Sequence, residues 1–143
     1  MRFAHRSLTI LAGIGLFLNF VAALPLSAHE VAPAVPKEAR ERKNPMPRED
    51  AVITAGKDLY ARLCLECHGL SGKGDGPAAA ALPHRPPDLT KVLKGQTDGE
   101  IFWKTAKGGG AMPSYAKILT ETEHWQVIHY LRTLKAPAER RRR

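Results

Sequence analysis

Cys64-Leu65-Glu66-Cys67-His68 is the most informative stretch of this chain of 143 residues. Two cysteines separated by two residues and followed at once by a histidine form the attachment pattern of a c-type haem. Both thiols fall within one turn of backbone, so they can add to the two vinyl groups along one edge of a haem. The histidine then lies beneath the iron and can bind it. The motif therefore predicts one covalent haem c, with Cys64 and Cys67 as thioethers and His68 as an iron ligand.

The same spacing of cysteines also occurs in zinc sites, redox-active dithiols and disulfides. The chain has two cysteines, both in the motif, so a four-cysteine zinc site is excluded. His124 and His129 keep a zinc site of two cysteines and two histidines open, but His68 would have no role in it. A thioredoxin-like dithiol needs a βαβ context, whereas this sequence predicts helices and loops. Haem attachment is the preferred interpretation.

The N-terminus predicts export. A short basic stretch, Met1 to Arg6, precedes an uncharged and mostly apolar run, Leu8 to Leu26, which ends in Leu26-Ser27-Ala28. This layout is typical of a signal peptide over residues 1–28 and predicts a periplasmic protein. The alternative is an uncleaved anchor that tethers the chain to the inner membrane, although the run is near the lower length limit for a span.

The net charge of +8 is concentrated outside the predicted folded part. Residues 49–137 hold eleven basic and ten acidic side chains, so this part is almost neutral and nucleic acid is not an expected partner. The basic tail, residues 138–143, ends in four arginines. This tail or the N-terminal segment could make weak contact with anionic lipid, although such tails are more often simply solvated.

Residues 29–48 are rich in proline, alanine and charge and show no apolar periodicity, which predicts a disordered linker. Residues 49–137 then form one small domain, at a size where side chains alone make a marginal core. A buried haem would supply the missing apolar mass.

The folded part is predicted to be all-α. Apolar residues recur at helical spacing over residues 52–64 and lead directly into the motif. Capping boxes at Thr97–Glu100 and Thr120–Glu123 open two further helices. Glycines and prolines over residues 69–89 predict a loop between the first helix and the second.

The candidates for a second iron ligand are methionines and histidines. Met112 lies in the glycine-rich run Gly108–Pro113, on a loop that could reach the open face of a haem, and is the preferred candidate. Met46 lies in the predicted linker and is a poor one. His84, His124 and His129 are the alternatives, and His84 leads them because it lies on a loop.

The pattern resembles the class I c-type cytochromes, the small monohaem electron carriers, over residues 50–137. The resemblance rests on Gly56–Tyr60 before the motif, Pro86-Pro87-Asp88-Leu89, Met112-Pro113, and the helix Trp125–Leu134. It implies the cytochrome c fold, with three to five short helices around one haem. It also implies that Pro87 accepts a hydrogen bond from His68 through its carbonyl and that Tyr130 packs on Gly56. Further haem-packing residues would be Tyr60, Leu89 and Tyr115.

The function implied is outer-sphere one-electron transfer in a bacterial periplasmic or respiratory chain, with soluble or membrane-bound redox proteins as partners and no catalytic residues. The first alternative is a haem c subunit of a larger oxidoreductase. A five-coordinate haem enzyme or sensor is less favoured, because it requires that Met112 does not bind the iron.

Overall fold

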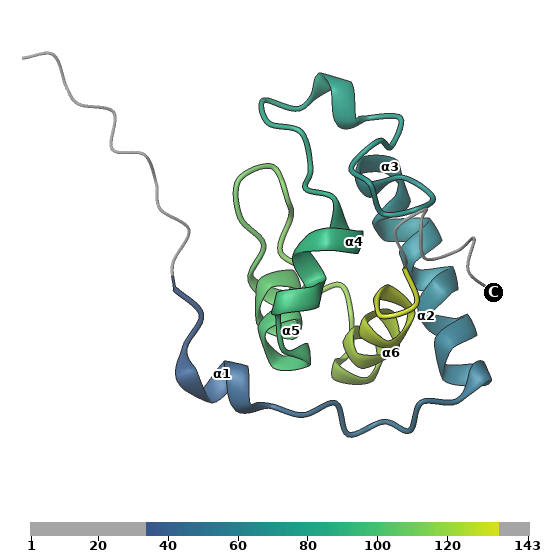
Figure 1. The fold of residues 1–143 in the computed structure, drawn as a ribbon, viewed down its shortest axis with the longest axis vertical. Coiled ribbons are helices and arrows are strands. Elements are labelled where there is room, and N and C mark those ends of the chain that lie inside the picture. Colours follow the sequence, from purple (N-terminus) through teal and green to yellow (C-terminus); the bar gives the residue numbers. More distant parts are fainter. Residues whose placement is uncertain (1–33, 135–143) are drawn as a thin grey trace, which may run out of the picture. The chain divides into compact units, whose positions relative to one another are not determined.

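The computed structural model describes residues 34–134, and its elements are all helical (Figure 1). They are α1 (Lys37–Glu41), α2 (Asp50–Leu63), α3 (Leu65–His68), η1 (Ala79–Ala81), α4 (Leu89–Val92), η2 (Leu93–Gly95), α5 (Asp98–Lys107) and α6 (Glu121–Leu131). Within the described part, pairing of β type is limited to one isolated bridge, between Gly109 and Met112. The predicted all-α class is confirmed. The predicted signal segment, residues 1–28, and basic tail, residues 138–143, lie outside the described residues. None of the described helices is long and apolar enough to cross a membrane.

Helices α2 and α6 cross at a glycine and form the centre of the fold. A Cβ atom on Gly56 would collide with the backbone carbonyl of Gln126, so the crossing requires glycine at this position. The Tyr130 ring lies 5.1 Å from the ring of Tyr60, one turn after Gly56 in α2. The predicted packing of Tyr130 on Gly56 stays a prediction. Trp125, Tyr60 and Ile128 are the largest fully buried side chains.

Both predicted capping boxes are present and set the beginnings of α5 and α6. The Thr97 hydroxyl accepts from the backbone N–H of Glu100 at 3.1 Å, and the Glu100 carboxylate accepts from the N–H of Thr97 at 2.8 Å. Thr120 and Glu123 repeat the arrangement at 3.2 and 2.8 Å. Each box satisfies two N–H groups that have no partner within the helix.

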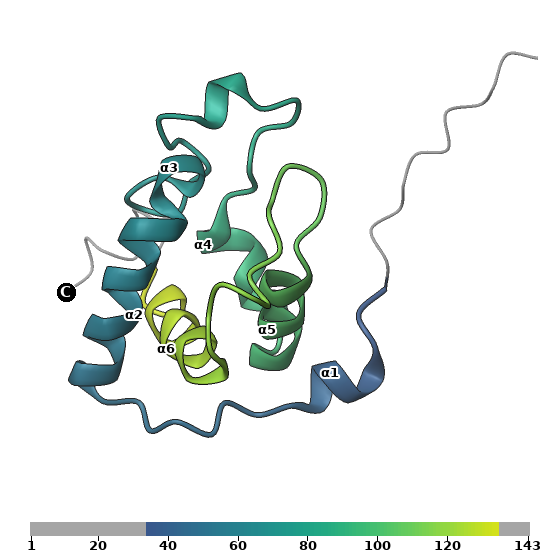
Figure 2. The same ribbon diagram turned by 180° about the vertical axis from the view of Figure 1, so that it is seen from behind.

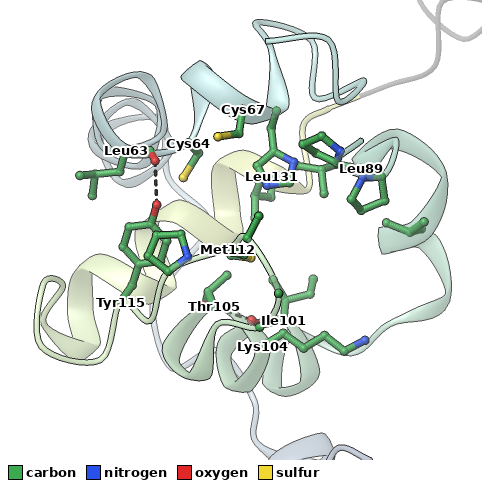
Figure 3. A pocket seen from close by; sticks show the side chains of 18 of the residues that line it. Leu63, Cys64, Cys67, Leu89, Ile101, Lys104, Thr105, Met112, Tyr115 and Leu131 are labelled. Carbon is green, nitrogen blue, oxygen red and sulfur yellow. Dashed lines mark hydrogen bonds between the residues drawn. The ribbon is translucent and has the colours of Figure 1, made fainter. Parts of the chain in front are cut away.

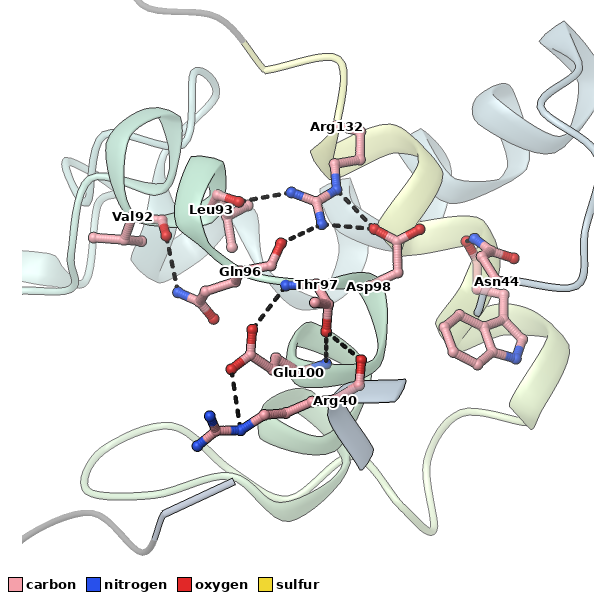
Figure 4. A network of polar contacts seen from close by, with 10 residues as sticks. Arg40, Asn44, Val92, Leu93, Gln96, Thr97, Asp98, Glu100 and Arg132 are labelled. Atoms are coloured by element: carbon pink, nitrogen blue, oxygen red, sulfur yellow. Dashed lines mark hydrogen bonds and ion pairs between the residues drawn. The ribbon is translucent and has the colours of Figure 1, made fainter. Parts of the chain in front are cut away.

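Arg132, just after α6, ties that helix to the segment before α5 (Figure 4). Its guanidinium donates to the carbonyls of Leu93 and Gln96, each at 2.6 Å, and pairs with the Asp98 carboxylate at 2.6 Å. Several donors held in a rigid fork give arginine a geometric specificity that lysine lacks. This contact fixes how the segment around α4 and η2 lies against the helical core.

Residues 34–48, which we call the N-terminal strap, are folded, so the prediction of a disordered linker over 29–48 is wrong for this part. The strap consists of α1 and an extended segment that runs beside α5 and α6 before it turns into α2 (Figures 1 and 2). Val35 is buried, and α1 packs against α5. The folded unit therefore begins before the predicted boundary at residue 49.

The strap is held through its backbone carbonyls and the side chains of Asn44, Arg40 and Arg42, and Arg40 pairs with Glu100 at 3.6 Å. Thr97 donates to the carbonyl of Arg40 at 2.8 Å, and His129 Nε2 donates to the carbonyl of Met46 at 3.0 Å. Asn44 donates to the carbonyl of Trp125 at 3.1 Å. The Arg42 guanidinium lies 4.3 Å from the centre of the Phe102 ring. Backbone carbonyls leave no trace in a hydrophobic pattern, which is why the sequence did not reveal this packing.

Candidate haem site

A cavity of about 510 Å³ lies on the inner side of the cysteine motif, in the size range of about 300–1,000 Å³ that is usual for ligand sites. Its walls come from α2, α3, the segment 82–93, α5, the loop 109–113 and α6. Most of the lining side chains are apolar. Such a hollow is unusual in a domain of this size, because protein interiors are normally close-packed.

The cysteine motif turns sharply at the end of α2. Helix α2 ends at Leu63, and the N–H groups of Cys67 and His68 both donate to the carbonyl of Cys64, at 3.2 and 2.8 Å. This turn puts both thiols on the cavity wall (Figure 3). The two cysteines are not joined in a disulfide. Both groups are thus positioned for addition to one ligand.

The thiol of Cys64 is poorly suited to redox catalysis. Burial, with a smaller contribution from Cys67, raises its pKa to about 12. A catalytic dithiol needs a thiol with a lowered pKa, because the thiolate is the nucleophile. The electrostatics of the motif therefore oppose the dithiol alternative.

His68 also lines the cavity, with its ring partly buried. Burial lowers the pKa of this histidine, which favours the neutral imidazole that metal ligation requires. Its Nδ1 atom is buried and has no hydrogen-bond partner among the described residues. A histidine that binds a metal through one ring nitrogen normally donates the N–H of the other to a carbonyl or carboxylate, so this Nδ1 atom is free to take the acceptor that such a ring needs.

Met112 and His84 both line the cavity, whereas the other candidates for the second iron ligand do not. His124 is buried against Phe102, and its Nδ1 donates to the carbonyl of Thr120 at 3.1 Å. His129 contacts the strap, as described above. Met46 lies in the strap, away from the cavity. The structure thus reduces the sequence-derived set to Met112 and His84.

The remaining predicted site residues all lie on the cavity wall, and they are Tyr60, Pro87, Leu89 and Tyr115. The hydrogen bond predicted between His68 and the Pro87 carbonyl is not formed in the structure. The segment around Pro87 is hydrogen-bonded to the glycine-rich loop that follows the cysteine motif. Leu89 donates to the carbonyl of Gly72 at 2.7 Å, and Arg85 to that of Gly74 at 2.9 Å. The role of Pro87 stays a prediction.

Several wall residues were missed in the sequence. Arg85, Gln96 and Lys104 add polar groups to the cavity, and Val127 and Leu131 of α6 add apolar surface. Lys104 Nζ donates to Gln96 Oε1 at 2.7 Å. Lys104 lies three residues after Ile101 and therefore on the same side of α5. This spacing was the one sequence signal that could have placed Lys104 at the cavity.

The zinc alternative finds no support in the described part of the chain. No three His, Cys, Asp or Glu side chains of residues 34–134 come close enough together to hold a metal ion. His124 and His129, which that alternative needed, face α5 and the strap instead.

These residues fit a haem. An apolar cavity offers two unpaired thiols on one turn, a neutral imidazole beside them and a thioether on a loop at the wall. A helical domain with this motif and cavity belongs to the class I c-type cytochromes. The family model described as "Cytochrome C oxidase, cbb3-type, subunit III" matches residues 51–131, which is more than half of the chain. The chain belongs to this family of cytochrome c domains, whose cofactor is a covalently bound haem c with its iron.

Solved structures agree with the fold. A chain of the reducing HAO-like protein complex of Kuenenia stuttgartiensis is 31% identical, with a TM-score of 0.60, over 76% of this chain and 53% of that one. The present chain therefore spans about half the length of that relative. Cytochrome cL from Hyphomicrobium denitrificans is 22% identical, with a TM-score of 0.51, over 73% of this chain and 67% of that one. No curated protein matches the chain.

Proposed function

We propose that the chain is a one-electron carrier whose haem is joined to Cys64 and Cys67 and whose iron is bound by His68 and Met112. The observation that carries this proposal is the presence of all four side chains on the wall of one apolar cavity of about 510 Å³. When bound, the haem supplies the reversible one-electron chemistry of its iron.

The chain's own residues favour electron transfer over catalysis. If His68 and Met112 both hold the iron, they would leave substrate no position at the metal. Two ligands fixed by the protein would also limit the structural reorganisation that accompanies electron transfer. A thioether ligand and an apolar wall favour the reduced state and raise the reduction potential. No residue is assigned a catalytic role.

The polar wall residues suit the carboxylate groups at the edge of a haem. Lys104 and Arg85 both reach the cavity and carry positive charge. In a largely apolar site, a cation near a carboxylate stabilises its ionised form. We assign these two residues to orientation of the group, with the opposite, vinyl edge directed at Cys64 and Cys67.

Export to the periplasm and partnership with other redox proteins complete the proposal. The signal-like segment at the N-terminus supports export, because such a segment directs the chain that follows it across the membrane. Membership of a complex is the second candidate. It is favoured by the likeness to a chain of the HAO-like complex, of which the present chain covers only 53%. Gel filtration of native extract separates the two, because a free monomer contradicts the complex.

Optical spectra of the purified oxidised and reduced protein test the haem assignment. The protein is produced in a host that matures c-type cytochromes, and a colourless product would refute covalent haem. Substitution of Met112 by Ala should abolish the weak long-wavelength iron–sulfur band and lower the reduction potential. His84→Ala is the matched control and should keep the band. A spectrum that lacks this band in the parent, is unchanged by Met112→Ala and changes in His84→Ala would assign the second ligand to His84.

Carbon monoxide distinguishes a carrier from an open-iron enzyme or sensor. The reduced parent protein should bind carbon monoxide slowly or weakly at neutral pH, because Met112 must first leave. The Met112→Ala variant should bind it rapidly. Rapid binding by the parent protein would contradict the carrier proposal.

A further inference from the structure

The Tyr115 side chain connects the loop that carries Met112 to the helix that carries Cys64. Tyr115 lies three residues after Met112, and its hydroxyl donates to the carbonyl of Leu63 at 2.8 Å (Figure 3). Leu63 is the last residue of α2 and immediately precedes Cys64. The last carbonyls of a helix lack partners within it, so this acceptor is available to a side chain.

The other hydrogen bonds that residues 114–116 donate connect to α5 and not to α2. Tyr115 N–H donates to the carbonyl of Thr105 at 3.1 Å, and Ala116 N–H donates to that of Ala106 at 3.2 Å. The Ser114 hydroxyl also donates to Ala106, at 2.6 Å. All of these bonds attach the segment to α5. Among the hydrogen bonds described for residues 112–116, that of the Tyr115 hydroxyl is the one that reaches α2.

We propose that Tyr115 is a positioning residue that holds the Met112 loop against the cysteine-bearing end of α2. This inference rests on the proposed binding of iron by Met112. A haem joined to Cys64 and Cys67 moves with the end of α2, so a bond from the loop to Leu63 keeps Met112 at a constant distance from the iron. An external ligand can reach the iron only when the loop opens and this bond breaks.

Burial makes the hydroxyl a dependable donor. Tyr115 is 8% exposed, and burial raises its pKa, so it keeps its proton at neutral pH. Removal of the hydroxyl alone leaves the ring in place and the Leu63 carbonyl without this donor. A hydrogen bond of this kind has a modest net value, but loss of one partner from a buried pair adds the cost of an unsatisfied group. That cost appears only in the closed state of the loop, so the open state becomes more populated.

Imidazole titration of the oxidised holoprotein tests the proposal. The Tyr115→Phe variant should bind imidazole roughly three- to tenfold more tightly than the parent. Its long-wavelength iron–sulfur band should also disappear at a lower temperature, before global unfolding. Affinity for imidazole within twofold of the parent would overturn the proposal.

Asn44→Ala controls for a merely structural effect. Asn44 lies in the strap and does not line the cavity, and its side chain donates to the carbonyl of Trp125 and accepts from the N–H of Met46. This variant should lose stability and keep the parent's affinity for imidazole. An equal rise in affinity in both variants would show that general destabilisation is the cause, and would overturn the positioning role of Tyr115.

Met112→Ala, measured alongside, separates this inference from the proposed function. If Met112→Ala keeps the iron–sulfur band, both the axial assignment and the role of Tyr115 are overturned. If Met112→Ala loses the band while Tyr115→Phe behaves as the parent, the carrier proposal stands and only the positioning role fails.

Discussion

The haem-motif segment, residues 50–68, and the N-terminal strap, residues 34–48, are neighbours in the chain but are held in place differently. The haem-motif segment has a helical pattern of apolar residues, and its side chains enter the core and the cavity wall. The strap has a five-residue helix and is attached largely through backbone carbonyls. The comparison teaches that a short peptide can be part of a fold without any periodic signal, when neighbouring helices supply the donors.

The family match sharpens this contrast. It covers residues 51–131, so it includes the haem-motif segment and leaves the strap outside. The strap is therefore an addition to the matched domain, and it covers surfaces of α5 and α6. Variants in the haem-motif segment should remove the cofactor or the core, whereas variants in the strap should lower stability and leave the haem spectrum unchanged.

Removal of both motif thiols should have the largest effect. With Cys64→Ser and Cys67→Ser, no covalent haem forms and the cavity of about 510 Å³ loses its contents. A void of that size corresponds to a cost on the order of 10 kcal/mol, comparable to the stability of a whole domain. A haem-stained denaturing gel and far-UV circular dichroism should show no haem and little folded protein. Normal helicity without haem would show that the side chains alone are enough to fold the domain, and would contradict this prediction.

Gly56→Ala tests the crossing of α2 and α6. The added methyl group would collide with the carbonyl of Gln126, and both groups belong to packed helices that cannot easily separate. We expect a loss of about 2 kcal/mol in the free energy of unfolding, even though alanine is the better helix former. Urea unfolding, followed by circular dichroism, measures this loss. An unchanged midpoint of urea unfolding would contradict the close contact between α2 and α6 at Gly56.

Gly99→Ala, in α5, makes the equivalent test of the contact between α5 and the strap. A Cβ atom on Gly99 would collide with the carbonyl of Ala39. The strap can shift where a core helix cannot, so we expect a smaller loss, about 1 kcal/mol. Proteolysis within residues 34–48 should become faster, while the haem spectrum stays that of the parent. A spectral change would contradict the separation of the two regions.

Arg42→Ala probes a strap side chain that makes both an ion pair and a contact with an aromatic ring. The guanidinium pairs with Glu121 at 2.6 Å and lies over the ring of Phe102. Both partners of the ion pair are substantially exposed, so the pair and the ring contact together should contribute about 1 kcal/mol or less. Arg42→Lys keeps the charge and should retain part of that stability. Thermal unfolding at low and high salt measures both variants, and the ion-pair part should shrink with salt.

Acid should weaken the same region slightly through His124. Burial is the main cause that lowers the pKa of His124, and Arg42 adds to it, while the bond to the Thr120 carbonyl, Glu123 and Glu121 oppose it. The unfolded chain therefore binds the proton first. Stability is fully present above pH 6.5 and falls as the pH drops from there towards the lower folded-state pKa. Urea unfolding between pH 8 and pH 5 should show a shallower decline in His124→Gln than in the parent. Parallel curves would contradict this assignment.

Much of the site could be predicted from the sequence, because its signals are local. The CxxCH spacing, the two capping boxes and the helical periodicity before the motif all act within one or two turns of backbone. Met112 was chosen as the preferred candidate for the second ligand by its place on a glycine-rich loop, and this stays a prediction. The choice among Met112 and the three histidines could not be completed, because it depends on which segments meet at the cavity. His124 and His129 are excluded by packing against α5 and the strap, which no local pattern shows.

The sequence by itself determined that this is a helical domain with a covalent haem motif, since attachment chemistry needs only residues that are close in the chain. Only the tertiary structure decided that residues 34–48 belong to the fold, that His84 shares the cavity with Met112, and that Tyr115 connects the Met112 loop to Leu63. These features join residues far apart in the chain through carbonyls and a single hydroxyl. Such contacts depend on where helices cross, and the crossing of α2 and α6 is set by the absence of a side chain at Gly56.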